Sequence, residues 1–449
     1  MENDRKTLWL ETIRMAWPAV LESFFVSLAA MIDTMMVSSL GTYAVAAVGL
    51  TTQPKFIALA VFFSCNIAVS ALVARRRGQG DRTNANEILL TALVFVFIAV
   101  LIITALTVLF APQIITIAGS NPDTHQGGVN YFRIIQGGMI FNVISLVINA
   151  AQRGSGNTKI AMRTNITSSI INVIFNYLLI GGHFGFPRLE LVGAALATVL
   201  GTVVAAIMSV ASLFHKNSYV SIPYITQEKI KPSLDILRSI TSLSSNFLIE
   251  NFAMRIGFLT TALIAARIGT DPFAVHQVGM NFLSLGFAFG DGMQVAAVAL
   301  IGRSLGEKDP EKAKQYGNIC QSIGLMISIV LATILFFEGR FLFSLFFKEP
   351  SVLDMGVTVS YYIMVILLAQ ISQVVYGGCL RGAGDVKYCL FASLISVTLI
   401  RTLVTWALTG AIINIGLHGI WIGILADQAS RLLLLAPRFY QGKWVEYKI

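Results

Sequence analysis

Long apolar runs separated by short polar segments dominate this chain. A run of about 20 apolar residues can cross the roughly 30 Å hydrocarbon core of a bilayer as a helix, because a helix rises about 1.5 Å per residue. The runs are continuous rather than alternating, which favours helices over the strands of a barrel. The pattern predicts twelve spans, over residues 12–38, 50–74, 88–110, 128–152, 163–182, 191–214, 241–267, 275–302, 316–337, 354–380, 388–413 and 419–437.

Positive charges are distributed unequally among the polar segments. If the N-terminus lies in the cytoplasm, the loops on that side hold most of the Lys and Arg residues, including the run Arg75–Arg77. The outer loops and span edges hold only Lys55, Arg188, Arg267, Arg340 and Lys348. By the positive-inside rule, we predict a multi-pass protein of the cell's inner (plasma) membrane with both termini in the cytoplasm.

Composition supports a membrane protein. The chain of 449 residues is 55% hydrophobic and 12% charged, whereas soluble domains average about 25% charged residues. The net charge of +9 lies in loops without interleaved aromatic residues, so the expected partner is the lipid bilayer and not nucleic acid. The four cysteines fall in apolar segments without metal-ligand spacing, which is typical of small apolar fillers.

The two halves of the sequence repeat each other at a fixed offset. The residue numbers of Arg153 in "QRGSGNTK" and Arg381 in "LRGAGDVK" differ by 228, and Glu22 in "VLESF" and Glu250 in "LIENF" have the same offset. "ALVARRRGQGD" and "ALIGRSLGEKD" repeat in the same register. Six spans per copy is an even number, so both copies run in the same direction. We therefore predict an all-α integral membrane protein with two six-helix lobes related by a pseudo-two-fold axis along the membrane normal: residues 1–220, which include the link between the lobes, and 221–449.

One acid lies deep inside an apolar run. Asp33, in "LAAMIDTMMV", is flanked along the chain by Glu22 and Lys55 as the nearest charges. A charge at the bilayer centre costs about 2.5–3.5 kcal/mol on insertion scales, so intramembrane acids are functional candidates. Eleven residues return a helix to within about 20°, so one helix face presents both Glu22 and Asp33. We expect Glu22 to lie near the cytoplasmic edge, where water solvates it.

Several polar residues in other spans are candidate partners for these acids. Asn172 and Asn176 lie one helical turn apart, and with Asp33 and Thr198 they form an oxygen-rich set that suits a hard cation or a protonated acid. Asparagines can equally hold helices together. Glu250 and Arg255 lie on the same helix but face differently, and how Asp291 and Arg401 neutralise these two charges stays open. Asp427 and Arg431, four residues apart, are expected to form a structural pair.

The motifs in their order resemble those of a known transporter family. "SSLGTYAVAAVGL", "RGSGNTKIAMRTNITSSIINVIFNYLLIGG", "GAALAT" and "LRGAGDVK" are similar to segments of MATE (multidrug and toxic compound extrusion) transporters of the prokaryotic NorM/DinF-like type. The resemblance covers essentially the whole chain. It implies a secondary active exporter of amphipathic, often cationic, small organic molecules, which uses no cofactor other than a coupling ion, H⁺ or Na⁺. It also implies cation coupling, including a Na⁺ site, at Asp33, Asn172, Asn176 and Thr198, and a coupling role for Glu250.

The sequence departs from NorM-like relatives at one position. They carry an acid in the tenth span where this chain has Gln370, so coupling is expected to depend on Asp33 and Glu250. We expect the chain to act as a monomer, with an adaptable substrate cavity between the lobes. The candidate lining residues are Phe24, Phe25, Met31, Met35, Phe252 and Met254.

Other functions fit the sequence less well. A lipid-linked sugar flippase of the same superfamily is the alternative transport function, but such proteins usually have further spans and a cationic central cavity. An enzyme is not expected, because HExxH, GxSxG and Walker A motifs are absent from the sequence and the five histidines are scattered. A passive channel is disfavoured by two lobes that each carry one set of acids.

Overall fold

The structure of the protein, a computed structural model, describes residues 2–40, 42–118, 120, 122–215, 218–268, 270–347, 349–410 and 412–446. The regular elements of this part are helices, with one isolated antiparallel bridge between Thr409 and Asn414. The chain forms two compact units. The N-unit is Leu21–Ser244, and the C-unit combines the residues up to Val20 with those from Ser245 onward. Both boundaries fall inside long helices, α1 (Glu2–Ser38) and α10 (Leu234–Ile268).

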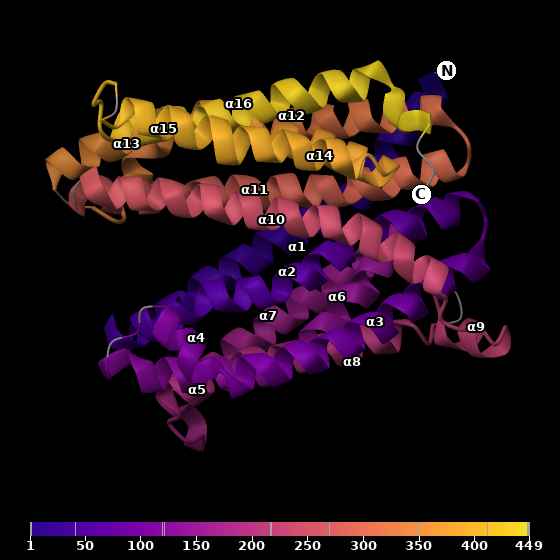
Figure 1. Cartoon of the computed structure of the whole chain (residues 1–449), viewed down its shortest axis with the longest axis horizontal. Coiled ribbons are helices and arrows are strands. Elements are labelled where there is room, and N and C mark those ends of the chain that lie inside the picture. The colour runs from indigo at the N-terminus through magenta and orange to yellow at the C-terminus, as the bar shows by residue number, and fades with distance from the viewer. Residues whose placement is uncertain are drawn as a thin grey trace. The chain divides into compact units, whose positions relative to one another are not determined.

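The N-unit is a bundle of helices, coloured indigo to magenta in Figure 1. Its elements after α1 are α2 (Thr42–Gly78), α3 (Arg82–Leu109), α4 (Ala111–Ile117), α5 (Pro122–Gly137), α6 (Met139–Gly154), α7 (Thr158–Gly181), η1 (His183–Gly185), α8 (Glu190–Ser212) and α9 (Ile222–Gln227). In this bundle α7 packs on α8, while α5 and α6 each pack on α2 and α8. α5 and α6 are bent by 44° at Gly138, where an added Cβ would lie 2.6 Å from Val199.

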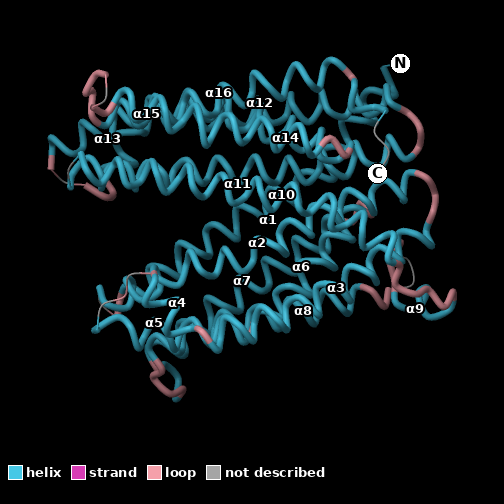
Figure 2. The backbone as a smooth tube through the Cα atoms, viewed as in Figure 1, coloured by secondary structure: helices cyan, strands magenta, loops and turns pink. Residues whose placement is uncertain are grey.

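The C-unit is built around one central helix. Its elements after α10 are α11 (Thr270–Gly306), α12 (Pro310–Ser344), α13 (Pro350–Ala383), α14 (Val386–Ser393), η2 (Leu394–Arg401), α15 (Thr402–Leu408), α16 (Leu417–Gln441) and η3 (Lys443–Glu446). The central helix, α13, packs against α11, α12 and α16. The π-helix η2 is continuous with α14 and α15, so these three elements form one long helical segment. Figure 2 shows short loops joining the helix ends.

The predicted spans correspond to these helices. In the described residues, ten helices are long and apolar enough to cross a membrane, and the bent pair α5–α6 makes an eleventh if it counts as one span. The remaining predicted span, 241–267, lies in α10. The helices extend beyond several predicted boundaries: α1 already begins at Glu2, whereas the apolar run indicated residue 12.

The sequence repeat is also a repeat of local structure. Asp81 begins α3 by accepting a hydrogen bond from the backbone N–H of Asn84 at 3.0 Å. Asp309 begins α12 in the same way, with the N–H of Lys312 at 2.9 Å. Asp309 and Lys312 are the counterparts of Asp81 and Asn84 at the offset of the sequence repeat. An N-cap carboxylate satisfies backbone donors that the helix itself cannot, so the duplicated Asp fixes the same helix start in each unit.

Close helix contacts repeat at the same offset. A Cβ on Gly154 would collide with the backbone oxygen of Ser70, and one on Gly382 would collide with that of Val298. The glycines of "RGSG" and "RGAG" therefore let α6 approach α2 and let α13 approach α11. This close approach positions the arginine that precedes each glycine.

Buried apolar clusters hold each unit together. One C-unit cluster contains Tyr316, Cys379 and Trp444, and a second is built around Phe343 and Trp421. The N-unit has clusters around Leu191 and Phe132. All four cysteines are free and buried, as expected for apolar fillers.

Candidate functional site

The carboxylate of Asp33 in α1 meets α7 inside the N-unit. The side-chain amide of Asn176 donates to Asp33 Oδ1 at 2.5 Å. Asn176 is fully buried, whereas Asp33 is only partly buried. The carboxylate of Asp33 is therefore still partly accessible, whereas the side chain of Asn176 is enclosed by the bundle.

The other two predicted residues adjoin this pair. Asn172 donates to Thr198 Oγ1 on α8 at 3.2 Å, and its own Oδ1 lies 3.4 Å from the amide nitrogen of Asn176. Thr198 in turn donates to the backbone oxygen of Ala194 at 3.1 Å. The structure therefore brings together the four residues Asp33, Asn172, Asn176 and Thr198, which come from three helices.

This cluster has a surplus of acceptor oxygens. Asn176 Oδ1 is buried and has no hydrogen-bond partner. A buried acceptor without a partner is costly, so the position favours an added proton donor or a cation. The described residues contain no group of three or more His, Cys, Asp or Glu that could hold a metal ion. A hard cation here would take one carboxylate and otherwise amide and hydroxyl oxygens.

Two further residues of the cluster escaped the sequence analysis. Tyr131 of α5 is buried next to Thr198, close enough to Asp33 to feel its charge. Lys55 of α2 also interacts electrostatically with Asp33, while its ammonium lies 5.4 Å from the ring of Phe56. Lys55 was assigned only to the outer edge of a span. Neither residue belongs to a motif, and only the packing of α1, α2 and α5 places them near the acid.

Glu22 is not solvated at the cytoplasmic edge, so that expectation is wrong. Its side chain is buried, with the residue 6% exposed, and it forms an ion pair with Arg153 of α6. Asn165 of α7 donates to the same carboxylate at 2.5 Å. Asn165 and Asn176 are eleven residues apart on α7, as Glu22 and Asp33 are on α1. The predicted shared face of α1 therefore exists, and it lies against a matching polar face of α7.

Glu250 has the corresponding environment in the C-unit. It is 2% exposed, pairs with Arg381 at 2.5 Å and accepts a hydrogen bond from Ser393 at 2.6 Å. Arg381 also donates to Gln294 at 2.5 Å. The partner of Glu250 is thus Arg381 and not Arg401, the cation that the sequence left open. Arg153 and Arg381, which the charge count treated as cytoplasmic loop charges, are buried ion partners near the ends of α6 and α13.

A second ion cluster lies in the C-unit. Asp427 of α16 binds two guanidinium groups: Arg431 at 3.0 Å, the predicted pair one turn away, and Arg401 at 3.4 Å. Gln428 donates to Asp427 at 3.0 Å and accepts from Gln373 at 3.1 Å. All five side chains are buried. Removing one partner of such a buried set leaves an uncompensated charge.

Gln370 is the residue at which the family resemblance implies an acid. It is fully buried in α13, and its amide nitrogen lies 3.3 Å from the backbone oxygen of Leu283. Asp291 of α11 is exposed and close enough to Arg381 for their charges to interact. The neutral amide of Gln370, on α13, thus contacts the backbone of α11.

The predicted lining residues lie on α1 and α10. Phe25, Met31, Met35 and Phe252 are exposed by more than a third of their surface. Phe24 and Phe25 stack edge to face with ring centroids 5.6 Å apart. Met254 instead accepts a weak hydrogen bond from Arg431 at 3.9 Å. A lining role for these six residues stays a prediction.

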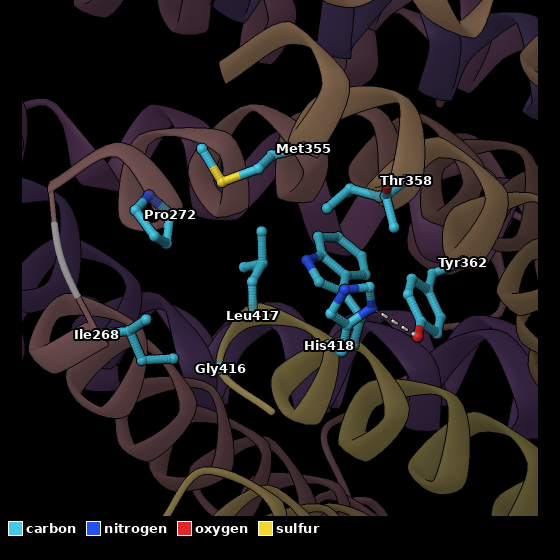
Figure 3. Close-up of a pocket in the computed structure, with 10 residues that line it drawn as sticks. Ile268, Pro272, Met355, Thr358, Tyr362, Gly416, Leu417 and His418 are labelled. Atoms are coloured by element: carbon cyan, nitrogen blue, oxygen red, sulfur yellow. Dashed lines mark hydrogen bonds between the residues drawn. The ribbon is translucent and has the colours of Figure 1, made fainter. Parts of the chain in front are cut away.

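The C-unit also contains an apolar pocket of about 290 Å³ (Figure 3). It lies between the adjoining ends of α10 and α11 and the first turns of α13 and α16. Tyr362 and His418 form a hydrogen bond of 3.1 Å at its edge. The lining residues are Ile268, Pro272, Met355, Thr358, Val359, Tyr362, Gly416, Leu417, His418 and Trp421.

Comparisons with known proteins identify the family of this chain. The MatE family model matches residues 18–178 and 247–407, one match in each half. The probable multidrug resistance protein NorM of Thermotoga maritima is 26% identical over 439 residues, covering 97% of this chain and 92% of that protein. The uncharacterized transporter YisQ of Bacillus subtilis is 24% identical over 438 residues, covering 96% and 94%.

The fold has a solved counterpart. An outward-facing structure of a multidrug resistance MATE family transporter of the MOP superfamily aligns with a TM-score of 0.90, at 22% identity and 97% coverage of both chains. At this identity the likeness shows the fold alone. Since the family model matches both halves over most of their length, this chain belongs to the MatE family of membrane transporters.

Proposed function

We propose that this protein is a secondary active multidrug exporter, which exchanges H⁺ or Na⁺ for amphipathic, often cationic, organic molecules by alternating access. It would act as a monomer in the inner (plasma) membrane with both termini in the cytoplasm. The segments 1–220 and 221–449 would serve as its two lobes. The names of relatives such as the NorM protein of Thermotoga maritima support the class of substrate.

The observation that carries the proposal is the Asp33 cluster. It combines a carboxylate that is partly accessible with a buried amide oxygen, Asn176 Oδ1, that lacks a donor. A proton on Asp33, or a Na⁺ ion between the carboxylate and the amide oxygens, would satisfy both groups. Either ion neutralises a charge that is costly within a bilayer.

The energy for export would come from the ion gradient. One charge that moves through the membrane potential contributes about 2.3 kcal/mol per 100 mV. If the cation and the cationic substrate compete for the same carboxylate, binding of one favours release of the other. This competition couples the inward movement of the cation to the outward movement of the substrate.

Ion-driven dye flux tests the proposal. Purified protein is reconstituted into liposomes, and efflux of ethidium is followed under an imposed Na⁺ gradient, an imposed H⁺ gradient, or neither. We expect flux above that of protein-free liposomes with at least one ion gradient and none without a gradient. Equal flux in all three conditions would indicate a passive pathway and contradict the proposal.

A further inference from the structure

The sequence repeat extends into the candidate cation site. Asp33 and Thr261 are related by the repeat offset. Asn165 and Ser393, whose side chains donate to Glu22 and Glu250, are related by the same offset. Thr261 is therefore the counterpart of Asp33. The C-unit thus has a neutral hydroxyl where the N-unit has its carboxylate.

The offset increases by one within η2. This segment is a π-helix, whereas the matching part of α7 is a regular α-helix. A π-turn holds one residue more than an α-turn, so positions at the end of η2 and beyond it match in a register shifted by one. Leu179 and Leu408, which are related by this shifted register, confirm it. Each backbone oxygen accepts one hydrogen bond from a residue just before the next helix, Leu189 at 2.8 Å and Ile415 at 3.0 Å.

Two further correspondences follow. In the shifted register, the counterpart of Asn172 is Arg401. The residues around the next helix are related by a third offset. It relates Leu189 to Ile415. It also relates Gly193 to Gly419, the glycines that pack closely on Leu179 and Leu408 respectively. This third offset makes Asp427 the counterpart of Gly201.

The C-unit therefore has a cation of its own at the equivalent position. Arg401 Nε donates to Thr261 Oγ1 at 3.0 Å, and Arg401 Nη1 lies 3.4 Å from Asp427 Oδ2. The guanidinium also lies over the ring of Phe258, 4.7 Å from its centroid. The arginine is 1% exposed. In the N-unit the direct partner of the acid is a neutral amide and Lys55 acts on it only through its charge, whereas the acid of the C-unit already holds a guanidinium.

We propose that Arg401 is a resident substitute for the coupling cation, so that the C-unit takes up no cation and each transport cycle exchanges cation only at Asp33. This inference rests on the proposed function. Asp427 is shared by two guanidinium groups, and Glu250 is held by Arg381. These two buried acids of the C-unit are thus already paired, and the positive charge of Arg401 repels a further cation.

Counting bound cations tests this inference. Equilibrium binding of radioactive Na⁺ and the number of protons released on addition of ethidium are measured on the purified full-length protein. We expect one cation per molecule for the unmodified protein and none for Asp33→Asn. Two cations in the unmodified protein, or one remaining in Asp33→Asn, would overturn the inference while leaving the proposed function intact. No cation of either kind in the unmodified protein would overturn the proposed function itself.

A matched pair of variants tests the role of Arg401 directly. In the Asp33→Asn background, Thr261→Asp adds an acid beside Arg401, and Thr261→Asp/Arg401→Asn adds the same acid while removing the resident cation. We expect the first variant to bind no cation and the second to bind one. Binding by both, or by neither when both elute as folded protein in size-exclusion chromatography, would contradict the proposal. If the second variant does not fold, the count for Asp33→Asn alone still decides.

Discussion

Glu22 and Glu250, which occupy equivalent positions of the sequence repeat, each pair with an arginine that is itself duplicated at the same offset, Arg153 and Arg381. Both acids are buried, and each accepts a second hydrogen bond from a neighbouring helix. The two ion pairs therefore fasten the same three-helix junction once in each unit. Their shared geometry indicates a common structural role that was retained in both copies.

Neutralising either acid should destabilise the protein to a similar extent. Glu22→Gln and Glu250→Gln each leave a buried arginine without its counter-charge, which typically costs about 3–5 kcal/mol. We expect a clear and comparable fall in unfolding temperature for both, measured in detergent. The double variant Glu250→Gln/Arg381→Gln should recover part of the loss. A loss confined to Glu250→Gln would show that Glu22 is not held as the structure shows.

Asp33→Asn should abolish ion-driven efflux and leave folding intact. The amide keeps the size of the side chain but cannot take a proton or offer a full negative charge. We expect ethidium flux to fall to the level of protein-free liposomes, with unchanged expression and unfolding temperature. Normal flux at normal protein levels would remove Asp33 from the coupling mechanism.

Asn176→Ala should separate the two candidate ions. Na⁺ needs several oxygens, whereas H⁺ needs only the carboxylate, so loss of Asn176 Oδ1 should reduce Na⁺-driven flux more than H⁺-driven flux. Gln370→Ala is the control in the other unit and should change either flux little. An inactive Gln370→Ala beside a normal Asn176→Ala would mean that the site has been assigned to the wrong unit.

Lys55→Gln should tighten cation binding at Asp33. The ammonium lies close enough to the carboxylate to compete electrostatically with an arriving cation. Its removal should lower the cation concentration for half-maximal ethidium efflux by a few-fold. An unchanged half-maximal concentration would mean that Lys55 exerts no effective charge at the site.

The turn between α11 and α12 should show a pH-dependent contribution to stability. Partial burial acts to raise the pKa of Glu307, but hydrogen bonds and charges from Lys312 and Arg303 outweigh it and lower this pKa below its usual value near 4.5. The charged carboxylate therefore stabilises the fold above that value, and the contribution is lost as pH falls through the lowered pKa. Glu307→Gln should lower the unfolding temperature at pH 7 and match the unmodified protein once the pH is well below 4. A difference that persists in acid would contradict this assignment.

The sequence was sufficient to predict the helices and the repeat, because bilayer thickness constrains apolar runs and duplicated loops carry a readable register. It also placed Asp33 with Asn176, but through the family resemblance, since helical spacing alone relates only Asn172 to Asn176. The sequence did not predict the partners of the buried acids Glu22 and Glu250. Arg153 and Arg381 lie at the ends of apolar runs, where charge counting assigns them to loops, and only close packing at Gly154 and Gly382 brings them to the acids.

The contribution of Arg401 was also beyond the sequence pattern. At the constant offset of the repeat, Asn172 aligns with Ile400, which suggests nothing about charge. The one-residue shift becomes visible only in the backbone hydrogen bonding of η2. Apolar periodicity cannot reveal such a shift, because both registers give an apolar helix.

The π-helix at Leu394–Arg401 also marks the place where two otherwise equivalent helical segments of the units differ in length by one residue. A π-turn takes up one extra residue locally, so the helix beyond it keeps the facing of its counterpart, as the matching backbone contacts of Leu179 and Leu408 show. The extra residue therefore lets the C-unit place a different set of side chains in η2 itself, including Arg401, while its later helices keep the positions of their N-unit counterparts.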